Sequence, residues 1–262
     1  VVPADDVLSH TFNYSSGATA YASASKTIAE DGATGYTVHL GVSGQNNTRA
    51  RWMTSEYYNA ADSTVVVEGD YSWYGADHNW ALTGWNFVTT DSKAMFIGMR
   101  SDGGNRKFFI GFSTGNQITA YNFRYAGITA ANPDAGLLVC DPGAMPEFRK
   151  TLSQFSAKWV VSGYRYMLYI GEYGEEATQL ILDIDIQKYA SVVKLDKDGN
   201  GDEDLNNKLW GGSHASSVDK VAPDMSSFRM GFALFNDNVG TGLASKCCLL
   251  YTSPSPRDTE RS

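Results

Sequence analysis

Residues 157–170 decide the fold class, and they read Ala157-Lys158-Trp159-Val160-Val161-Ser162-Gly163-Tyr164-Arg165-Tyr166-Met167-Leu168-Tyr169-Ile170. Apolar and polar side chains alternate here, and the apolar ones are mostly β-branched or aromatic. This pattern is typical of strands that bury one face. The segment therefore predicts two strands, Lys158 to Val161 and Tyr164 to Tyr173.

The same alternation recurs along most of the chain, whereas helical periodicity is nearly absent. It predicts further strands at Val7 to Tyr14, Tyr36 to Val42, Arg49 to Thr54, Thr64 to Trp73, Ala94 to Arg100, Lys107 to Phe112, Gln117 to Phe123, Gly136 to Cys140, Gln179 to Ile186 and Ser227 to Phe235. The turn Ser101-Asp102-Gly103-Gly104-Asn105 should join two of them as antiparallel partners, because its glycines allow a tight reversal.

One segment favours a helix instead. Pro146 suits a first helical turn, and Phe148, Leu152, Phe155 and Trp159 would then share one face. The sequence therefore predicts a short helix here, inside a chain that is otherwise all-β.

Composition limits the class of protein. The chain has 262 residues, 42% hydrophobic and 19% charged, which is enough for one large core. With 21 Lys and Arg against 29 Asp and Glu the net charge is −8, and there is no basic stripe, so a nucleic-acid partner is not expected. No apolar run approaches the length of a membrane span, so membrane insertion is not expected either. Long alternating strands with short connections predict one two-sheet antiparallel jelly-roll β-sandwich.

The C-terminal end does not follow the alternating pattern of the rest of the chain. Residues 248–258, Cys248-Leu249-Leu250-Tyr251-Thr252-Ser253-Pro254-Ser255-Pro256-Arg257-Asp258, resemble translated sequencing-adapter DNA, and residues 259–262 fit its continuation. We therefore predict one jelly-roll domain over residues 1–246, lacking its final strand, and a disordered tail over residues 247–262. A missing final strand would leave an open sheet edge beside Val7 to Tyr14. Cys140 is then the one cysteine of the domain, which argues against a disulfide framework.

The sequence also predicts a late strand that contains a glycine, Phe228-Arg229-Met230-Gly231-Phe232-Ala233-Leu234-Phe235. Together with the tryptophan-bearing strand Ala157–Val161 and the strand Tyr164–Ile170, it resembles the concanavalin A-like lectin/glucanase superfamily, in particular its non-catalytic laminin-G-like or pentraxin-like modules. The resemblance implies an extracellular or cell-surface module that binds a polysaccharide or glycan. Such a module would be covalently linked to other domains of a bacterial polysaccharide-processing or adhesive protein.

An acidic loop supplies a candidate metal site. Its oxygen-bearing side chains stand at every second position, in Asp196, Asp198, Asn200, Asp202 and Asp204. Ca²⁺ takes several hard oxygen ligands, and Gly201 at the sixth place allows the sharp turn of a calcium loop. The twelfth position is Asn207 and not the bidentate Glu of a sensor site. The loop therefore predicts a structural Ca²⁺, and a solvated acidic hairpin is the alternative.

An aromatic cluster supplies a candidate sugar site. Residues 71–85 hold three of the six tryptophans, and alternation assigns Tyr71 and Trp73 to the core. Flat rings beside polar groups suit the apolar faces and the hydroxyls of sugars. The predicted ligand-binding residues are Tyr74, Asp77, His78, Asn79, Trp80 and Trp85. The alternative is that these aromatic rings fill the core.

No complete set of catalytic residues is present. Asp183 and Asp185 share one strand face, but a third carboxylate is missing, so a two-carboxylate mechanism is unsupported. The alternative function is a polysaccharide lyase or glycoside hydrolase acting on the concave sheet face. That function would require convergence of side chains such as His39, Arg100, Arg165 and Tyr166.

Overall fold

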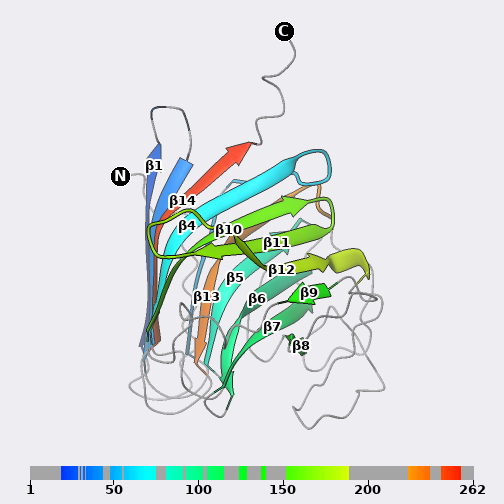
Figure 1. Cartoon of the computed structure of the whole chain (residues 1–262). Coiled ribbons are helices and arrows are strands. Elements are labelled where there is room, and N and C mark those ends of the chain that lie inside the picture. The colour runs from blue at the N-terminus through cyan, green and yellow to red at the C-terminus, as the bar shows by residue number, and fades with distance from the viewer. Residues whose placement is uncertain are drawn as a thin grey trace.

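The structure is a computed structural model, and it describes residues 19–28, 30, 32, 34–43, 48–54, 56–74, 81–90, 93–102, 105–114, 124–128, 137–139, 152–188, 224–236 and 243–254. Within these residues the one helical turn covers residues 186–188, and antiparallel strands dominate the rest. The strands form two sheets that enclose a common core (Figure 1).

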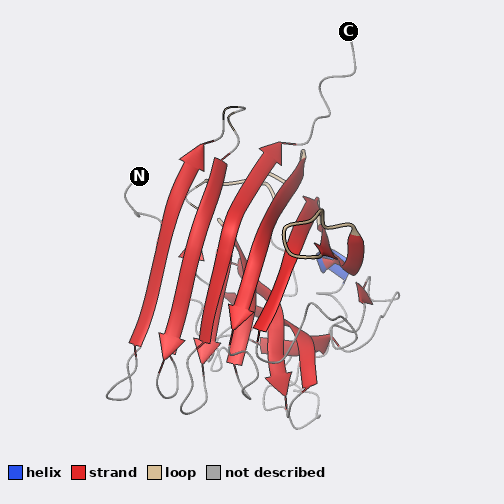
Figure 2. Cartoon of the chain, turned by 60° about the vertical axis from the view of Figure 1, so that its left-hand side comes forward, coloured by secondary structure: helices blue, strands red, loops and turns tan. Residues whose placement is uncertain are grey.

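The larger sheet has eight strands, and its long strands run side by side in Figure 2. In sheet order they are β1 Thr19–Ile28, β2 Thr34–Ser43, β14 Leu243–Pro254, β4 Thr64–Tyr74, β10 Leu152–Ser162, β11 Arg165–Gly171, β12 Gln179–Asp185 and β9 Leu137–Val139. The smaller sheet has six, in the order β3 Thr48–Met53, β13 Phe228–Asn236, β5 Ala81–Thr89, β6 Lys93–Asp102, β7 Asn105–Thr114 and β8 Arg124–Ile128.

The path of the chain makes this sandwich a jelly roll. The chain crosses from β2 in the larger sheet to β3 in the smaller one and back to β4. The two last strands then insert among the first ones, since β13 lies between β3 and β5 and β14 lies between β2 and β4. The predicted all-β, two-sheet antiparallel jelly roll is therefore confirmed.

Most predicted strands are confirmed too. The turn at residues 101–105 joins β6 to β7, and these two strands pair antiparallel from Lys93↔Thr114 to Asp102↔Asn105. The structure adds β1, β5, β8 and β14, which the alternation did not single out. β1 is rich in Ala and Ser, which carry little strand signal. The strands predicted at 7–14 and 117–123 lie outside the described residues.

The helix predicted from Pro146 onward is wrong where the structure describes it. Residues 152–162 form β10, in which Phe155, Ala157, Trp159 and Val161 are at most 1% exposed. These residues share a face in steps of two, because β10 pairs with β4 on one side and β11 on the other. Phe155 and Trp159 are four residues apart, a spacing that fits both periods, so those two rings alone could not separate helix from strand.

The disordered tail predicted from residue 247 is wrong as far as Pro254. Residues 243–254 form β14, so a strand occupies the place in the sheet where a gap was predicted. Its pairing with β2 and β4 uses backbone N–H and C=O groups, which depend little on the side-chain sequence. The register shifts on both sides after Cys248. Residues 255–262 and the predicted edge at 7–14 lie outside the described residues.

Aromatic side chains from both sheets form the centre of the core. Trp85 of the smaller sheet lies 5.3 Å from Trp159 of the larger one, and 5.4 Å from Tyr71, between ring centroids. Phe87 extends the contact to Tyr166 at 5.0 Å. These rings are at most 1% exposed, so the two sheets are joined by a dry aromatic layer. In the part of the chain that the structure describes, no helix is long and apolar enough to cross a membrane.

Glu56 ties the β1–β2 hairpin to the smaller sheet. Its carboxylate accepts hydrogen bonds from the Lys26 ammonium of β1 and the Tyr36 hydroxyl of β2. Its own segment is anchored to β13, because the Thr54 N–H donates to the Met230 carbonyl at 2.8 Å. Partial burial raises the pKa of Glu56, but the bonds from Lys26 and Tyr36 outweigh it, and the net pKa is lowered.

Acid should weaken this contact. A folded-state pKa below the unfolded value of about 4.3 means that the contact stabilises fully above that value and fades as the pH falls through the folded pKa. We therefore expect Glu56→Gln to lose roughly 1–2 kcal/mol at neutral pH and to show a shallower loss of stability in acid than wild type. Denaturant unfolding between pH 7 and pH 3 measures the loss of stability at neutral pH and its dependence on pH. Glu30→Gln, at an exposed position in the turn after β1, is the matched control. Parallel pH curves for wild type and Glu56→Gln would refute the role of Glu56.

Candidate functional site

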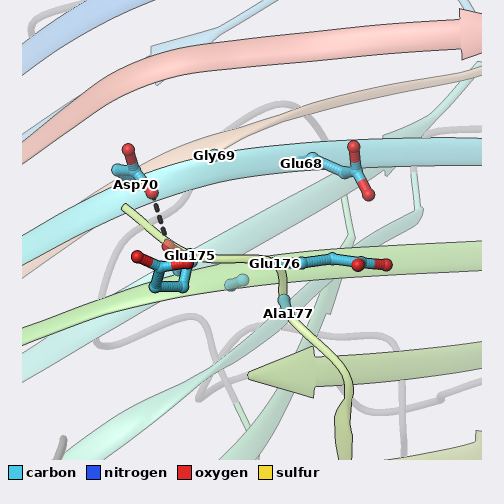
Figure 3. Close-up of a pocket in the computed structure, with 8 residues that line it drawn as sticks. Glu68, Gly69, Asp70, Glu175, Glu176 and Ala177 are labelled. Carbon is cyan, nitrogen blue, oxygen red and sulfur yellow. Dashed lines mark hydrogen bonds between the residues drawn. The ribbon is translucent and has the colours of Figure 1, made fainter. Parts of the chain in front are cut away.

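A pocket of about 180 Å³ opens on the face of the larger sheet that is turned away from the core. It is lined by Glu68, Gly69 and Asp70 of β4, Ser156 and Ala157 of β10, and Glu175, Glu176 and Ala177 of the loop between β11 and β12. Figure 3 shows the loop carboxylates beside the strand that carries Glu68 and Asp70. We call this the acidic pocket.

Strand alternation explains why acidic residues stand in the middle of the sheet. Val67 and Tyr71 of β4 are buried in the core, so Glu68 and Asp70 between them point to the outer face. The register of β4 with β10 then sets Ser156 opposite Asp70 and Lys158 opposite Glu68. The floor of the pocket is therefore fixed by pairing between strands that are far apart in the chain.

Ser156 fastens the loop over this floor. Its Oγ lies 2.6 Å from Asp70 Oδ1 and 2.9 Å from the Glu172 carbonyl oxygen, and it accepts a 2.9 Å hydrogen bond from the Gly174 N–H. Gly171 at the end of β11 lets the loop fold back closely, because a Cβ there would lie 2.4 Å from the Glu176 carbonyl oxygen. The loop that carries Glu175 and Glu176 is thus held by the sheet itself.

The pocket combines acceptors, a donor and nearby rings. The Lys158 Nζ lies 3.9 Å from an oxygen of Glu68 and 3.9 Å from an oxygen of Glu176. It also lies 5.3 Å from the centroid of the Tyr169 ring, a cation–π distance. Tyr173 on the loop is 45% exposed. Among the described residues no group of three or more His, Cys, Asp and Glu side chains is disposed to hold a metal ion.

The predicted aromatic sugar site is wrong at Trp85. This side chain is 0% exposed and packs against Tyr71 and Trp159. The reason is that Trp85 lies within β5, between β13 and β6, and alternation turns it inward. The core position predicted for Tyr71 is confirmed, at 1% exposed. Tyr74 ends β4, and its side chain, like Asp77, His78, Asn79 and Trp80, lies outside what the structure describes.

The predicted calcium ligands Asp196, Asp198, Asn200, Asp202 and Asp204 also lie outside the described residues. The calcium site therefore stays a prediction from the sequence.

Asp183 and Asp185 share the outer face of β12, as the alternation indicated, and each already has a structural partner. Arg165 holds Asp183 through two hydrogen bonds, of 2.8 Å from Nε and 2.5 Å from Nη2. Asp183 is only 7% exposed, and its hydrogen bonds raise the pKa of Arg165. Asp185 caps the helical turn by accepting from the N–H groups of Gln187 and Lys188. Both carboxylates therefore already make structural hydrogen bonds.

The side chains that a lyase-like site would require do not converge where they are described. Tyr166 is fully buried, its hydroxyl lies 2.8 Å from Met225 Sδ, and burial raises its pKa. His39 lies on β2 and Arg165 on β11, with β14, β4 and β10 between them. The side chain of Arg100 lies outside the described part of the chain.

Sequence reasoning did not find the acidic pocket. Its local signals are Glu68 and Asp70 within a strand and the acidic turn Glu172–Glu176. These segments are about a hundred residues apart, and only the strand register brings them together.

No protein-family model matches the sequence, and no curated protein matches it. Among solved structures, a functionally unknown protein from Saccharomyces cerevisiae is similar with a TM-score of 0.45 and 9% identity, over 88% of this chain and 92% of that one. An alginate lyase from Corynebacterium sp. is similar with a TM-score of 0.40 and 10% identity, over 88% and 81% of the two chains. The Emp47p carbohydrate recognition domain has a TM-score of 0.38 and 7% identity, over 90% and 88%. These are loose likenesses, and the fold assignment rests on the strand order given above.

Proposed function

We propose that this chain is a carbohydrate-binding module and that it binds its ligand in the acidic pocket. The observation that supports this most is the pocket itself, which places four carboxylates around one opening, with the Lys158 ammonium 3.9 Å from two of them. Sites for small polar ligands are concave and carry a few polar groups at fixed positions. The fixed groups here are those on β4 and β10 and on the loop that Ser156 anchors.

The chemistry of the pocket matches sugar hydroxyls. The carboxylates of Glu68, Glu175 and Glu176 accept hydrogen bonds from hydroxyl groups, and bonds to charged acceptors are the stronger kind. Lys158 donates to ring or hydroxyl oxygens. The exposed ring of Tyr173 offers a flat apolar surface for the C–H face of a sugar. Binding without turnover is the function we propose, because Asp183 and Asp185 are both engaged in structural contacts.

The proposed setting is extracellular or at the cell surface, within a larger polysaccharide-processing or adhesive protein. Support for this setting comes from the sequence resemblance to laminin-G-like modules. It is independent of the geometry of the acidic pocket.

Affinity electrophoresis in gels containing neutral plant or microbial polysaccharides tests the site. We expect wild type to be retarded by at least one of them, and Tyr173→Ala and Glu176→Gln each to weaken binding about tenfold, through loss of stacking and of a charged acceptor. Tyr164→Ala is the matched control, since Tyr164 is 39% exposed but lies in the turn between β10 and β11, beyond Ser162, where β10 ends. Equal retardation of the control and the two pocket variants would reject the pocket, and no retardation of folded wild type would reject the function.

We also propose that the loop from Asp196 to Asp204 binds one structural Ca²⁺. Support comes from its spacing of oxygen-bearing residues and from Gly201. We expect a chelator to lower the melting temperature and millimolar Ca²⁺ to restore it, because a ligand that binds only the native state stabilises it. Asp198→Asn together with Asp202→Asn should remove the response. A melting temperature that is the same with chelator and with Ca²⁺ would refute the calcium site.

A further inference from the structure

The acidic pocket already surrounds one ammonium group, that of Lys158. The Lys158 Nζ lies 3.9 Å from Glu68 Oε1, 3.9 Å from Glu176 Oε1 and 5.3 Å from the centroid of the Tyr169 ring. Carboxylates and the face of an aromatic ring are the groups with which proteins also bind the ammonium groups of ligands. The geometry of the acidic pocket therefore suits this chemical group.

The carboxylates of the pocket outnumber this one cation. Glu68, Asp70, Glu175 and Glu176 line the opening, as Figure 3 shows. Within the described residues Lys158 is the one cation that forms an ion pair with any of them. Four negative charges against one positive charge leave a formal net charge of −3 around the opening. Such an opening attracts cationic ligands and repels anionic ones.

A row of outward side chains leads from the pocket across the larger sheet. The register sets Lys158 opposite Glu68 on one side and opposite Tyr169 on the other. It also sets Leu180 of β12 opposite Tyr169. Directly paired residues share one face of a sheet, and Leu180 is 37% exposed on that face. Paired strands lie about 4.8 Å apart, so the row from Glu68 to Leu180 spans roughly 14 Å.

The pocket and the row can hold different parts of one ligand. At about 180 Å³ the pocket is smaller than the roughly 300–1,000 Å³ of sites that enclose a drug-sized molecule, so it suits a single sugar unit. Further units of a chain would lie along the row, where Tyr169 and Leu180 offer apolar surface to the C–H faces of sugar rings.

We propose that the acidic pocket binds an amino sugar through its ammonium group, and that this sugar is one unit of a cationic oligosaccharide of the glucosamine type. This specificity rests on the proposed carbohydrate binding and narrows it to one class of ligand. Glu175 and Glu176 accept hydrogen bonds from the ligand ammonium group, because Glu175 has no ion pair within the described residues and Glu176 shares Lys158 with Glu68. Chains of uronic acids are repelled by the same charge.

Titration of wild type at about pH 5.5 with two β-1,4-linked hexasaccharides tests the specificity. The glucosamine hexamer carries ammonium groups where the glucose hexamer carries hydroxyl groups of similar size. We expect the glucosamine hexamer to bind about tenfold more tightly, and this preference to shrink between about 50 mM and about 300 mM NaCl, because salt screens exposed charges. Equal affinity would overturn the amino-sugar specificity and leave the sugar pocket in place. No binding of either hexamer, with no retardation by neutral polysaccharides, would reject carbohydrate binding itself.

Glu175→Gln locates the preference in the pocket. This variant should reduce the preference for the glucosamine hexamer about threefold, since the neutral amide no longer attracts the ammonium group. Glu30→Gln, which removes the same charge from the exposed turn after β1, is the matched control and should keep the wild-type preference. An unchanged preference in Glu175→Gln, or an equal loss in Glu30→Gln, would contradict the assignment to the pocket.

Spermine distinguishes an amino sugar from any other polycation. We expect it to displace the glucosamine hexamer only at a concentration at least about tenfold higher, because it has no sugar ring to lie on Tyr169 and Leu180. Leu180→Ser should weaken the glucosamine hexamer about threefold and leave spermine unaffected. Displacement by spermine at equal concentration, or an equal effect of Leu180→Ser on both ligands, would overturn the amino-sugar assignment.

Discussion

Trp85→Ala should lower the free energy of unfolding by about 3–5 kcal/mol, the range for removing a large aromatic ring from a core. Trp85 is 0% exposed and contacts three rings of the opposite, larger sheet, with Tyr71 at 5.4 Å, Trp159 at 5.3 Å and Phe155 at 6.2 Å. Its loss would leave a cavity at the centre of the aromatic layer, where rigid strands on both sides limit collapse.

Denaturant unfolding followed by far-UV circular dichroism measures this effect. Trp85→Phe keeps most of the ring volume and should cost less than half as much as Trp85→Ala. A surface tryptophan that contacts a sugar would behave differently, since its removal would reduce binding and leave stability within about 0.5 kcal/mol of wild type. That second outcome would restore the ligand role that the sequence predicted for Trp85.

Gly231→Ala should destabilise the smaller sheet by about 2–3 kcal/mol or more. A Cβ on Gly231 would lie 1.8 Å from the Trp52 carbonyl oxygen and 2.7 Å from the Met53 Cα, which are both backbone atoms of β3. Backbone within a paired sheet cannot rotate away as a side chain can, so β3 and β13 would have to separate along their shared ladder.

The same unfolding measurement tests Gly231, with Gly32→Ala as the control. Gly32 has a φ of +83° and no atom within 4 Å of the added Cβ, so this change costs only backbone strain, about 1–2 kcal/mol. The loss of protection from hydrogen exchange in Gly231→Ala should be greatest in β3 and β13. Stability equal to wild type would show that the close approach of β3 to β13 is wrong.

The sequence predicts the sandwich because alternation is a local signal with a direct cause. Each strand that buries one face carries apolar side chains at every second position, and β2, β4 and β11 show this in Tyr36–Val42, Val65–Tyr71 and Tyr166–Ile170. The turn with two glycines predicts the β6–β7 hairpin for the same reason, since its geometry is set by adjacent residues.

The errors arise where neighbouring residues give the same signal for different structures. Phe155 and Trp159 fit a helix by their spacing, and only the partners on β4 and β11 make them strand residues. From the sequence, Trp85 is predicted to belong to an aromatic loop. In the structure it lies in β5, which pairs with β13 on one side and β6 on the other, and this pairing turns its side chain inward. Likewise β14 forms because β2 and β4 bind its backbone, a condition that its own side chains do not reveal.

The acidic pocket could not be predicted from the sequence, because none of the segments that line it carries a recognisable motif. Ser156 meets Asp70 across 86 residues of sequence, and Gly174 reaches Ser156 from the loop that follows β11. Charged residues on the outer face of a strand are common, and they usually face water. What makes these a pocket is the loop folded over them, which depends on the small residue at Gly171.

Hydrogen–deuterium exchange with and without a bound polysaccharide tests most directly whether the acidic pocket is the binding site. A ligand held there should slow exchange in residues 172–178 and in the adjoining parts of β4 and β10, and should leave β5, β6 and β13 unchanged. Protection centred on any of those three strands, or on residues 75–80, with no change in residues 172–178, would contradict the account.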